Sequence, residues 1–302
     1  MTPTPFIAEV SSNHGRDLKR AMAFIEAAAD VGCAGVKFQQ FRIDELFSRE
    51  ALAYDPALAR RRAWELPVEF NPELAACAHS HGVQFASTPF YRDAIAELEP
   101  WVDFFKISSY QVLWLDFLRE VARTGKPVVL ATGMAEMDEV AAAVDALAQG
   151  GCEAPTLLHC VSLYPTRPED AGLAAIEALR SRFDVPVGWS DHSANGAVVR
   201  RAIQRFDAQM IEFHMDLDRA GDEYAFGHCW LPAQIGAVIS SLALPASDGP
   251  GPSALDGDGQ KCPLAEEAHE RIWRSDPIDG LRPIRSARAE LARAVPLTES
   301  MK

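Results

Sequence analysis

The stretch FIAEVSSNHGRDLKRAMAFIEAAADVGCAGVKFQQ, residues 6–40, reads as a buried strand, a polar turn, a helix and a second buried strand. Apolar runs that begin at Phe6 and Gly35 supply the two strands. Asp17 stands where a helix N-cap accepts hydrogen bonds from backbone amides, and Gly32 stands where the same helix should end. The stretch therefore predicts an α/β fold built from strand–helix units.

The same strand–helix unit recurs along the rest of the chain. An Ala- and Leu-rich helical stretch follows each of eight short apolar, β-branched or aromatic runs. These runs begin near Phe6, Gly35, Val83, Asp103, Pro127, Thr156, Pro186 and Gln209. Eight such units predict a (β/α)8 TIM barrel.

The barrel is expected to span residues 1–245. The Gly- and Pro-rich stretch ASDGPGPSALDGDGQ, residues 246–260, then interrupts the alternation of strands and helices. Roughly 40 residues follow it, which is too few for an independent core. We therefore predict that residues 246–302 form a linker and a C-terminal tail packed on the barrel, and not a separate domain.

Composition and charge limit the classes of protein to which this chain can belong. With 302 residues, 48% of them hydrophobic, the chain is long enough for one large core. The net charge of -14 argues against nucleic-acid binding, because Arg60, Arg61 and Arg62 form the only run of three basic residues. We interpret these arginines as a solvated helix face, with an anion-steering loop as the alternative.

Two further absences concern the location of the protein. The six cysteines include no CxxC pair, which is typical of reduced thiols in a cytoplasmic protein. Neither a signal sequence nor an apolar run long enough to cross a membrane is present. We therefore predict a cytoplasmic protein with no membrane partner.

Polar side chains end every predicted strand. In a TIM barrel the carboxyl-terminal ends of the strands build the active site, whereas apolar residues within the strands fill the barrel. The polar residues at these ends are Glu9, Asn13, His14, Lys37, Gln39, Ser87, Thr88, Lys106, Ser108, Ser109, Thr132, His159, Ser162, Ser190, Asp191, His192, Glu212 and His214. We expect them to form a polar ring, and the insertion at residues 41–70 should lie on the same face as a lid.

Lys37 and Lys106 lie in the strand contexts GVKFQQF and FFKISSY, where an unpaired ammonium group would carry a large desolvation penalty. A substrate phosphate or carboxylate would remove this penalty, and hydroxyl groups at neighbouring strand ends favour that interpretation. Pairing of each lysine with a structural carboxylate is the alternative. A Schiff-base role for a desolvated lysine also remains open.

His192 in GWSDHS and His214 in IEFHMD end consecutive predicted strands. Adjacent parallel strands would bring both imidazoles into one coordination sphere. With carboxylates nearby, they suit Mn²⁺, Mg²⁺, Zn²⁺ or Fe²⁺. For His14 and His159, a place in the lining of the site and a purely structural place are both open. The remaining histidines, which include His228, carry no such context.

Eight motifs occur in order along roughly residues 6–285. They are IAEVSSNHGRDL, GVKFQQF, FASTPF, FKISSYQ, LATGM, LLHCVSLYPTRPEDAGLAAI, VPVGWSDHS and IEFHMDLDRAGDE. Together they resemble the sialic acid synthase family, whose barrel enzymes condense phosphoenolpyruvate with an N-acylamino sugar to make a nonulosonic acid. The resemblance implies a divalent metal, Mn²⁺ or Mg²⁺, and phosphoenolpyruvate and a sugar aldehyde as small-molecule partners. It also allows a homodimer.

The resemblance and the polar ring together assign roles to residues of this chain. Glu9, His14 and Glu212 are the candidate catalytic residues, and His192 and His214 are the candidate metal ligands. Contacts to phosphoenolpyruvate fall on Lys37, Thr88, Lys106, Ser109, Ser162 and Ser190. Contacts to the acceptor fall on Gln39, Gln111, Tyr164 and Glu223, to which we add Arg16.

Several positions depart from the family pattern. Phe213 stands where a basic residue is usual, and Gln111 stands where an acidic sugar ligand is common. Gly15 and Arg16 replace an amide or carboxylate followed by glycine. The small antifreeze-like domain that supplies an arginine to the partner's sugar site is expected to be missing. We predict that Arg16 and the loop of residues 41–70 replace it, with a solvated position for Arg16 as the alternative.

These observations favour a metal-dependent transferase that joins phosphoenolpyruvate to N-acetylmannosamine or a related aldehyde sugar. One alternative is a Schiff-base or metal-dependent aldolase that acts on a 2-oxo acid. The other is a non-catalytic barrel that binds sugar phosphates. Phosphate release that depends on both phosphoenolpyruvate and an acceptor would separate the first hypothesis from the other two.

Overall fold

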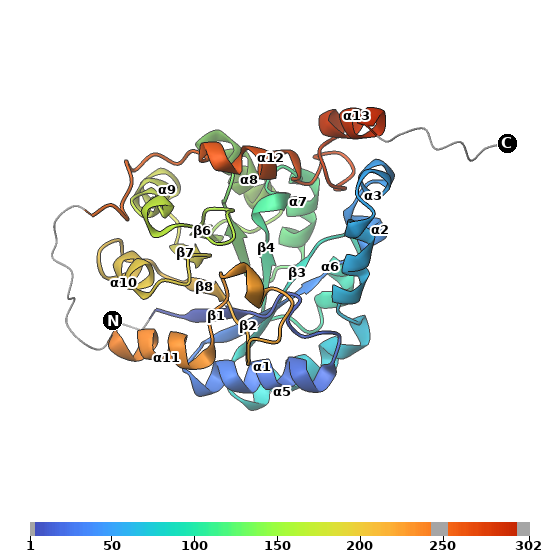
Figure 1. Ribbon diagram of the computed structural model, residues 1–302. Helices are drawn as coiled ribbons and strands as arrows, with labels where there is room; N and C mark the ends of the chain where they lie inside the picture. Colours follow the sequence, from blue (N-terminus) through green and yellow to red (C-terminus); the bar gives the residue numbers. More distant parts are fainter. Residues whose placement is uncertain (1–3, 243–252, 295–302) are drawn as a thin grey trace.

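Eight parallel strands close into a barrel in the computed structural model, which describes residues 4–242 and 253–294 (Figure 1). The strands are β1 (Phe6–Glu9), β2 (Gly35–Gln40), β3 (Gln84–Pro89), β4 (Phe104–Ile107), β5 (Val128–Ala131), β6 (Thr156–His159), β7 (Val187–Asp191) and β8 (Ile211–His214). Strand β8 pairs with β1, with Phe6 opposite Ile211 and Glu9 opposite His214. The predicted TIM barrel is confirmed.

A main helix follows each strand and covers the outside of the barrel (Figure 1). These helices are α1 (Leu18–Asp30), α5 (Asn71–Ser80), α6 (Asp93–Leu98), α7 (Leu115–Arg123), α8 (Met137–Gln149), α9 (Ala175–Phe183), α10 (Gly196–Gln204) and α11 (Pro232–Ser241). Asp17 caps α1 as predicted, because its carboxylate accepts hydrogen bonds from the backbone amides of Lys19 and Arg20. The apolar face of α1, which includes Phe24 and Ile25, packs into the main core.

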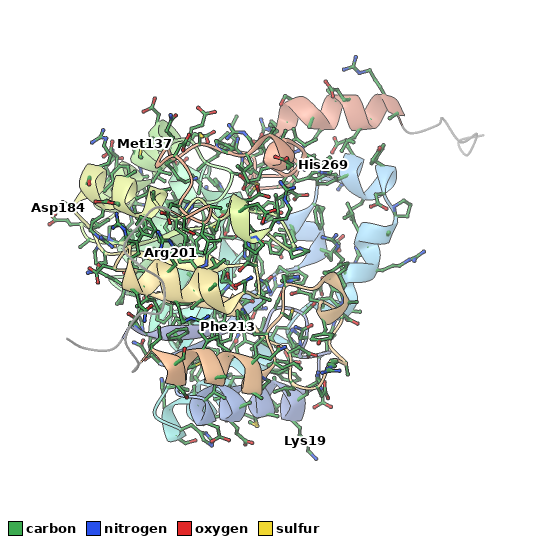
Figure 2. All side chains as sticks on the ribbon, turned by 60° about the vertical axis from the view of Figure 1, so that its left-hand side comes forward. Lys19, Met137, Asp184, Arg201, Phe213 and His269 are labelled. Carbon is green, nitrogen blue, oxygen red and sulfur yellow. The ribbon has the colours of Figure 1, made fainter. Side chains whose placement is uncertain are left out.

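Burial separates the interior of the barrel from its surface. Phe213 of β8 is fully buried, whereas Lys19 and Asp184 lie at the outside of the molecule (Figure 2). A smaller buried cluster, which includes Ile7 and Leu158, is separate from the main core between strands and helices. These apolar side chains leave the polar ends of the strands as the part of the barrel that can receive a ligand.

The insertion between β2 and α5 folds into short helices with their own small core. They are α2 (Ile43–Leu46), α3 (Arg49–Tyr54), α4 (Ala57–Arg60) and the 3₁₀ helices η1 (Arg61–Trp64) and η2 (Val68–Phe70). Ile43, Phe47 and Leu58 are buried together with Phe90 from the loop after β3. The insertion is therefore a packed element of the fold and not a structureless loop.

Residues 253–294, here called the C-terminal strap, cross the loops at the carboxyl ends of the strands (Figure 1). The strap contains η6 (Ala265–Glu267), α12 (Ala268–Ile272) and α13 (Arg285–Ala294). Its backbone or side chains bond to Leu173 after β6, Ala135 after β5, Tyr110 after β4 and Leu46 in the insertion, at 3.0, 2.8, 2.7 and 2.8 Å. The predicted boundary between barrel and tail at residue 245 stays a prediction, because residues 243–252 lie outside the described residues.

The structure also describes the cysteines and the hydropathy of the helices. All six cysteines are free thiols in the structure. Within residues 4–242 and 253–294, no helix has the length and apolar character needed to cross a membrane.

Candidate active site

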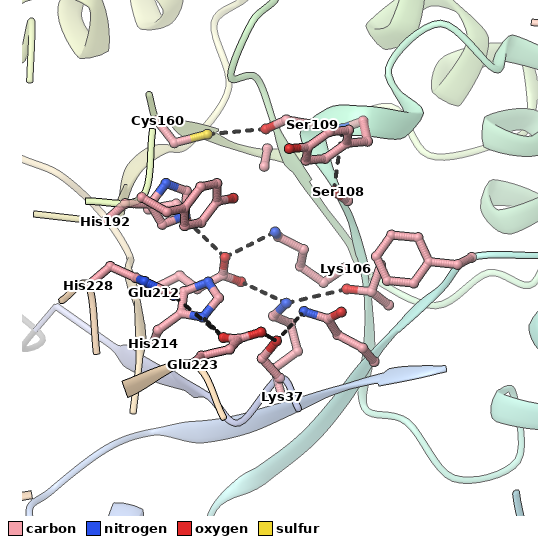
Figure 3. Close-up of a pocket in the computed structure, with 18 of the residues that line it drawn as sticks. Lys37, Lys106, Ser108, Ser109, Cys160, His192, Glu212, His214, Glu223 and His228 are labelled. Carbon is pink, nitrogen blue, oxygen red and sulfur yellow. Dashed lines mark hydrogen bonds and ion pairs between the residues drawn. The ribbon is translucent and has the colours of Figure 1, made fainter. Parts of the chain in front are cut away.

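A pocket of about 470 Å³ opens at the carboxyl-terminal ends of the strands (Figure 3). The structure brings most of the predicted site residues together in its lining. These residues are Lys37, Gln39, Thr88, Lys106, Ser109, Tyr164, Ser190, His192, Glu212, His214 and Glu223. Part of the polar ring inferred from the sequence therefore surrounds one cavity, whereas other members do not line it. Those members are Glu9, Asn13, His14, Ser87, Thr132, His159, Ser162 and Asp191.

The floor of this pocket is a buried network of opposite charges around Lys37, Lys106 and Glu212 (Figure 3). Ser190 belongs to this floor, and Glu9 supports it from beneath. Lys37 Nζ contacts the Glu9 carboxylate directly and lies 3.7 Å from Glu212 Oε2. Lys106 Nζ lies 3.0 Å from Glu212 Oε1, which also accepts a hydrogen bond of 2.9 Å from Ser190 Oγ. Each lysine thus has a structural carboxylate partner, which is the alternative that the sequence analysis ranked second.

The pKa values of the two floor lysines shift in opposite directions. Burial lowers the pKa of Lys37, but the carboxylates of Glu212 and Glu9 outweigh this effect and raise it. Burial also lowers the pKa of Lys106, and Glu212 offsets only part of this effect. Burial raises the pKa of Glu212, but Lys106 and Lys37 bring it down to about 2. The floor therefore holds an ionised Glu212 carboxylate between the two lysines.

A cradle of small polar groups, Ser109, Cys160 and Ser162, surrounds Gly133 beside the floor. A Cβ atom at position 133 would collide with the Ser162 and Ser109 hydroxyls and the Cys160 thiol. The Gly133 backbone amide donates to Ser109 Oγ at 2.9 Å. Ser162 Oγ is shielded from solvent and has no hydrogen-bond partner among the described residues. Its position leaves a buried hydroxyl free to bond a ligand.

Three histidines gather on one side of the pocket. The ring centroids of His192 and His214 are 5.4 Å apart, and those of His214 and His228 are 4.7 Å apart (Figure 3). Glu223 Oε2 lies 3.1 Å from His214 Nδ1 and 3.5 Å from His228 Nε2. The position of His228 at the site was not predicted, because this residue lies in a loop after β8 and ends no strand.

The hydrogen bonds of these imidazoles leave donor atoms for a metal ion. His192 Nδ1 bonds to the Val161 carbonyl at 2.7 Å and His214 Nδ1 bonds to Glu223, so the Nε2 atom of each ring has no partner that fixes it as a donor. Neither ring nitrogen of His228 has a hydrogen-bond partner among the described residues. This donor set fits a divalent metal.

Two overlapping sets of ligands share His214. The predicted set is His192 with His214. A second set, in which one ligand atom from each residue lies within 4.8 Å of the others, is His214, Glu223, His228 and Cys229. Burial raises the pKa of the Cys229 thiol to about 12, which makes it a poor ligand. Burial lowers the pKa of His192 and of His228, and both effects favour the neutral imidazole that binds metals.

Five predicted site residues do not line the pocket. Glu9 lies beneath it on Lys37, and the Ser162 hydroxyl lies in the cradle. His14 is buried, and its Nδ1 accepts a hydrogen bond of 2.9 Å from the Arg16 amide. Gln111 donates to the Pro89 carbonyl at 2.7 Å. Arg16 is exposed and its guanidinium donates to the Arg62 carbonyl at 2.8 Å.

The rim of the pocket, formed by Arg61, Trp64, Tyr110, Glu270 and Arg282, comes from outside the barrel strands. Arg61 and Trp64 belong to the insertion, and Glu270 and Arg282 belong to the C-terminal strap. Arg60, Arg61 and Arg62 are all exposed, as expected for a solvated face, and Arg61 also lines the pocket. No strand-end pattern marks the strap residues, and nothing in their local sequence indicated that they reach the site.

The chain matches a known protein family. The model of the NeuB family matches residues 24–244 of this chain. The N,N'-diacetyllegionaminic acid synthase of Campylobacter jejuni is 34% identical over 232 residues, which cover 72% of this chain and 69% of that protein.

Solved structures agree with this match. The spore coat polysaccharide biosynthesis protein SpsE from Bacillus subtilis has a TM-score of 0.78 at 28% identity, covering 90% of this chain and 77% of that chain. The N-acetylneuraminic acid synthetase from Leptospira borgpetersenii, solved with citrate, has a TM-score of 0.74 at 28% identity, covering 89% and 90%.

Proposed function

The chain belongs to the NeuB family, and we propose that it condenses phosphoenolpyruvate with the aldehyde form of an N-acylamino sugar to give a nonulosonic acid and phosphate. As a member of this family it is a phosphoenolpyruvate-dependent transferase that forms a carbon–carbon bond. The observation that carries the finer proposal is a floor with two lysines next to a cluster of three histidines in one pocket. The lysines of the floor suit a phosphorylated anion, and the histidine cluster suits a metal that activates a carbonyl group.

Phosphoenolpyruvate is proposed to bind over Lys37, Lys106 and the cradle. Glu9 and Glu212 already balance the charges of the two lysines, so the anion needs further hydrogen-bond donors. The Ser109 and Ser162 hydroxyls of the cradle supply them, together with Ser190 and with Thr88, whose Oγ1 lies 3.4 Å from Lys37 Nζ. This arrangement keeps the anion beside the floor without requiring an excess of positive charge.

The metal is proposed to bind to Nε2 of His192 and of His214, with His228 as a third imidazole ligand. Mn²⁺ or Mg²⁺ is the expected ion, and when bound it would polarise the aldehyde oxygen of the acceptor. Glu223 holds the His214 ring through Nδ1 and also accepts a hydrogen bond of 2.5 Å from Ser11 Oγ. Such a carboxylate fixes the tautomer and orientation of the metal-binding imidazole.

The condensation then proceeds between groups that this pocket orients. The methylene carbon of phosphoenolpyruvate attacks the aldehyde carbon, water adds to the cationic carbon that results, and the bridging oxygen leaves with phosphate. Glu212 is the candidate catalytic carboxylate that reaches the pocket, whereas Glu9 acts on Lys37 from below. Because Glu212 is ionised, we assign it the tasks of orienting Lys106 and stabilising the developing cation.

Gln39, Tyr164 and Glu223 are the proposed contacts to the acceptor. The Tyr164 ring lies 4.2 Å from that of His192, which places it over the proposed metal site. N-acetylmannosamine and related aldehyde sugars are the proposed acceptors. The cytoplasmic location and the homodimer remain predictions.

An acceptor screen tests this function. The protein would be incubated with phosphoenolpyruvate, Mn²⁺ and single aldehyde sugars, and phosphate release and product mass would be followed. We expect phosphate release only when both substrates are present, with a product mass equal to acceptor plus phosphoenolpyruvate plus water minus phosphate. If borohydride instead traps a pyruvate adduct on Lys106, the aldolase hypothesis replaces this one.

A further inference from the structure

Arg282 of the C-terminal strap presents an unpaired guanidinium group at the pocket wall. Its Nε and Nη2 atoms are shielded from solvent and have no hydrogen-bond partner among the described residues. The group lies 4.1 Å from the ring centroid of Tyr110 and 5.1 Å from that of Phe90. Ring contacts leave its N–H donors without acceptors, and a buried donor without an acceptor is costly. A ligand in the pocket can supply the missing acceptor.

The backbone of Arg282 is held firmly in this place. Its amide donates to the Leu46 carbonyl at 2.8 Å, and its carbonyl accepts from the Ser48 amide at 2.9 Å. A parallel β-bridge links it to Phe47. The strap and the insertion therefore position this arginine together.

A second unpaired arginine lines the same wall. Arg61 contacts the rings of Phe47 and Trp64, at 6.0 and 5.5 Å from their centroids, and forms no ion pair with any residue that the structure describes. Arg61 and Arg282 also line a side cavity of about 210 Å³ next to the pocket. Two guanidinium groups thus face the same space from two different segments.

Acidic groups lie near Arg61 and Arg282, and among the described residues none of them forms an ion pair with either arginine. Glu270 lines the shared wall, but its Oε2 accepts a hydrogen bond of 2.5 Å from the Tyr110 hydroxyl. Asp55 and His269 line the side cavity. Burial lowers the pKa of Arg282 to about 10, so it stays charged at neutral pH. The wall therefore offers guanidinium hydrogen-bond donors beside acidic side chains, separate from the floor.

We propose that Arg282 and Arg61 form an oxyanion subsite for the acceptor, which carries a phosphate or carboxylate group at the end away from its aldehyde. The proposal rests on the proposed function, since it concerns the second substrate of the same pocket. A guanidinium fork pairs with the planar or tetrahedral oxyanion of such a group in two parallel hydrogen bonds. The floor would then select phosphoenolpyruvate, and the rim would select the acceptor.

Calorimetric binding of unreactive alditols tests this subsite without any turnover. The probes are the reduced forms of N-acetylmannosamine, its 6-phosphate and its uronic acid, titrated into the full chain. We expect the 6-phosphate or the uronic acid to bind at least about tenfold tighter than the neutral alditol, since hydrogen bonds between charged groups are the strong ones. Arg282→Gln should remove this preference, and Arg61→Gln should weaken it.

The controls separate the subsite from folding and from the reaction. Arg60→Gln changes an exposed neighbour outside the pocket lining and should keep the full preference. Arg61→Gln changes an exposed side chain and should fold, so it can still test the subsite if Arg282→Gln does not fold. Equal binding of charged and neutral alditols by the wild type, or a preference unchanged in both variants, would overturn the proposal. Failure of the proposed function would appear separately, as absent phosphate release in the acceptor screen.

Discussion

The floor and the rim of this pocket are built by different means. Floor residues lie on barrel strands, and neighbouring strands set them side by side: Glu9 is opposite Lys37, and Ser190 is opposite Glu212. Each floor charge has a partner of opposite sign. The rim residues Arg61 and Arg282 come from the insertion and the strap, and their charges have no partner among the described residues.

This difference suggests that the floor and the rim have different roles in binding the two substrates. A paired network on a rigid barrel holds a fixed geometry, which suits the reacting atoms of phosphoenolpyruvate. Unpaired donors on added segments suit recognition of the remote end of a second substrate. Substitutions in the floor should therefore affect chemistry and phosphoenolpyruvate binding, whereas substitutions in the rim should change the choice of acceptor.

The largest effect is expected from the floor lysines. Lys37→Met or Lys106→Met removes the positive charge but keeps most of the stem, and we expect kcat/KM for phosphoenolpyruvate to fall by about 10³-fold. Steady-state kinetics, with thermal unfolding as a check on folding, measures this. Lys19→Met, at an exposed position, is the matched control. If neither floor variant changes the affinity for phosphoenolpyruvate, the lysines are purely structural.

Removal of the histidine cluster should also have a severe effect. His192→Ala and His214→Ala should abolish metal-dependent turnover and leave the fold largely intact, because both residues lie at the pocket and outside the apolar core. Excess chelator should have the same effect on the wild type. Full activity in chelator would contradict a metal-dependent reaction.

His228→Gln sharpens the assignment of the third ligand. It should weaken Mn²⁺ binding about tenfold, in the range seen when groups that support a metal site are removed. Titration of Mn²⁺ followed by electron paramagnetic resonance measures the affinity. His81→Gln, an exposed histidine far from the pocket lining, is the control. Unchanged Mn²⁺ affinity in His228→Gln would limit the site to His192 and His214.

Glu267 tests how far the strap supports the floor. Its buried carboxylate accepts hydrogen bonds from the Met134 and Ser162 amides, at 3.1 and 2.7 Å, and so ties the strap to the cradle. Glu267→Ala should lower the free energy of unfolding by about 1–3 kcal/mol and raise the KM for phosphoenolpyruvate. Denaturant titration and kinetics measure both. Glu266→Ala, at the exposed neighbouring position, should change neither the free energy of unfolding nor the KM. A normal KM in Glu267→Ala would show that the strap does not support the cradle.

The smallest effect is expected at Arg16. The sequence analysis assigned this arginine to the acceptor, but the structure directs its guanidinium to the Arg62 carbonyl. We therefore expect Arg16→Ala to raise the acceptor KM by less than about twofold, as for an exposed substitution. A large rise in the acceptor KM, with phosphoenolpyruvate binding preserved, would restore the earlier assignment.

These expectations reflect what a sequence can and cannot reveal here. Barrel strands repeat in a regular order, so polar residues at their ends could be assigned to one face before any coordinates were known. Lys37, Lys106, His192 and His214 were found in this way, and all of them line the pocket. The residues that each of them contacts depend on the register between neighbouring strands, which the sequence does not determine.

The rim could not be predicted for a physical reason. Arg282 reaches the pocket through a bridge to Phe47, a contact between residues more than 200 positions apart in the chain. His228 lies in a loop, and its approach to His214 depends on the path that the loop takes after β8. Contacts of this kind arise from tertiary packing and leave no periodic signal in the sequence.

One set of calorimetric titrations tests the division between floor and rim most directly. Phosphoenolpyruvate, the neutral alditol of N-acetylmannosamine, and its reduced 6-phosphate and uronic acid would each be titrated into the wild type, Lys106→Met and Arg282→Gln. We predict that Lys106→Met loses phosphoenolpyruvate binding and keeps its preference for a charged alditol. Arg282→Gln should lose that preference and bind phosphoenolpyruvate normally. If each variant weakens both ligands to the same extent, the pocket is one coupled site and the division is wrong.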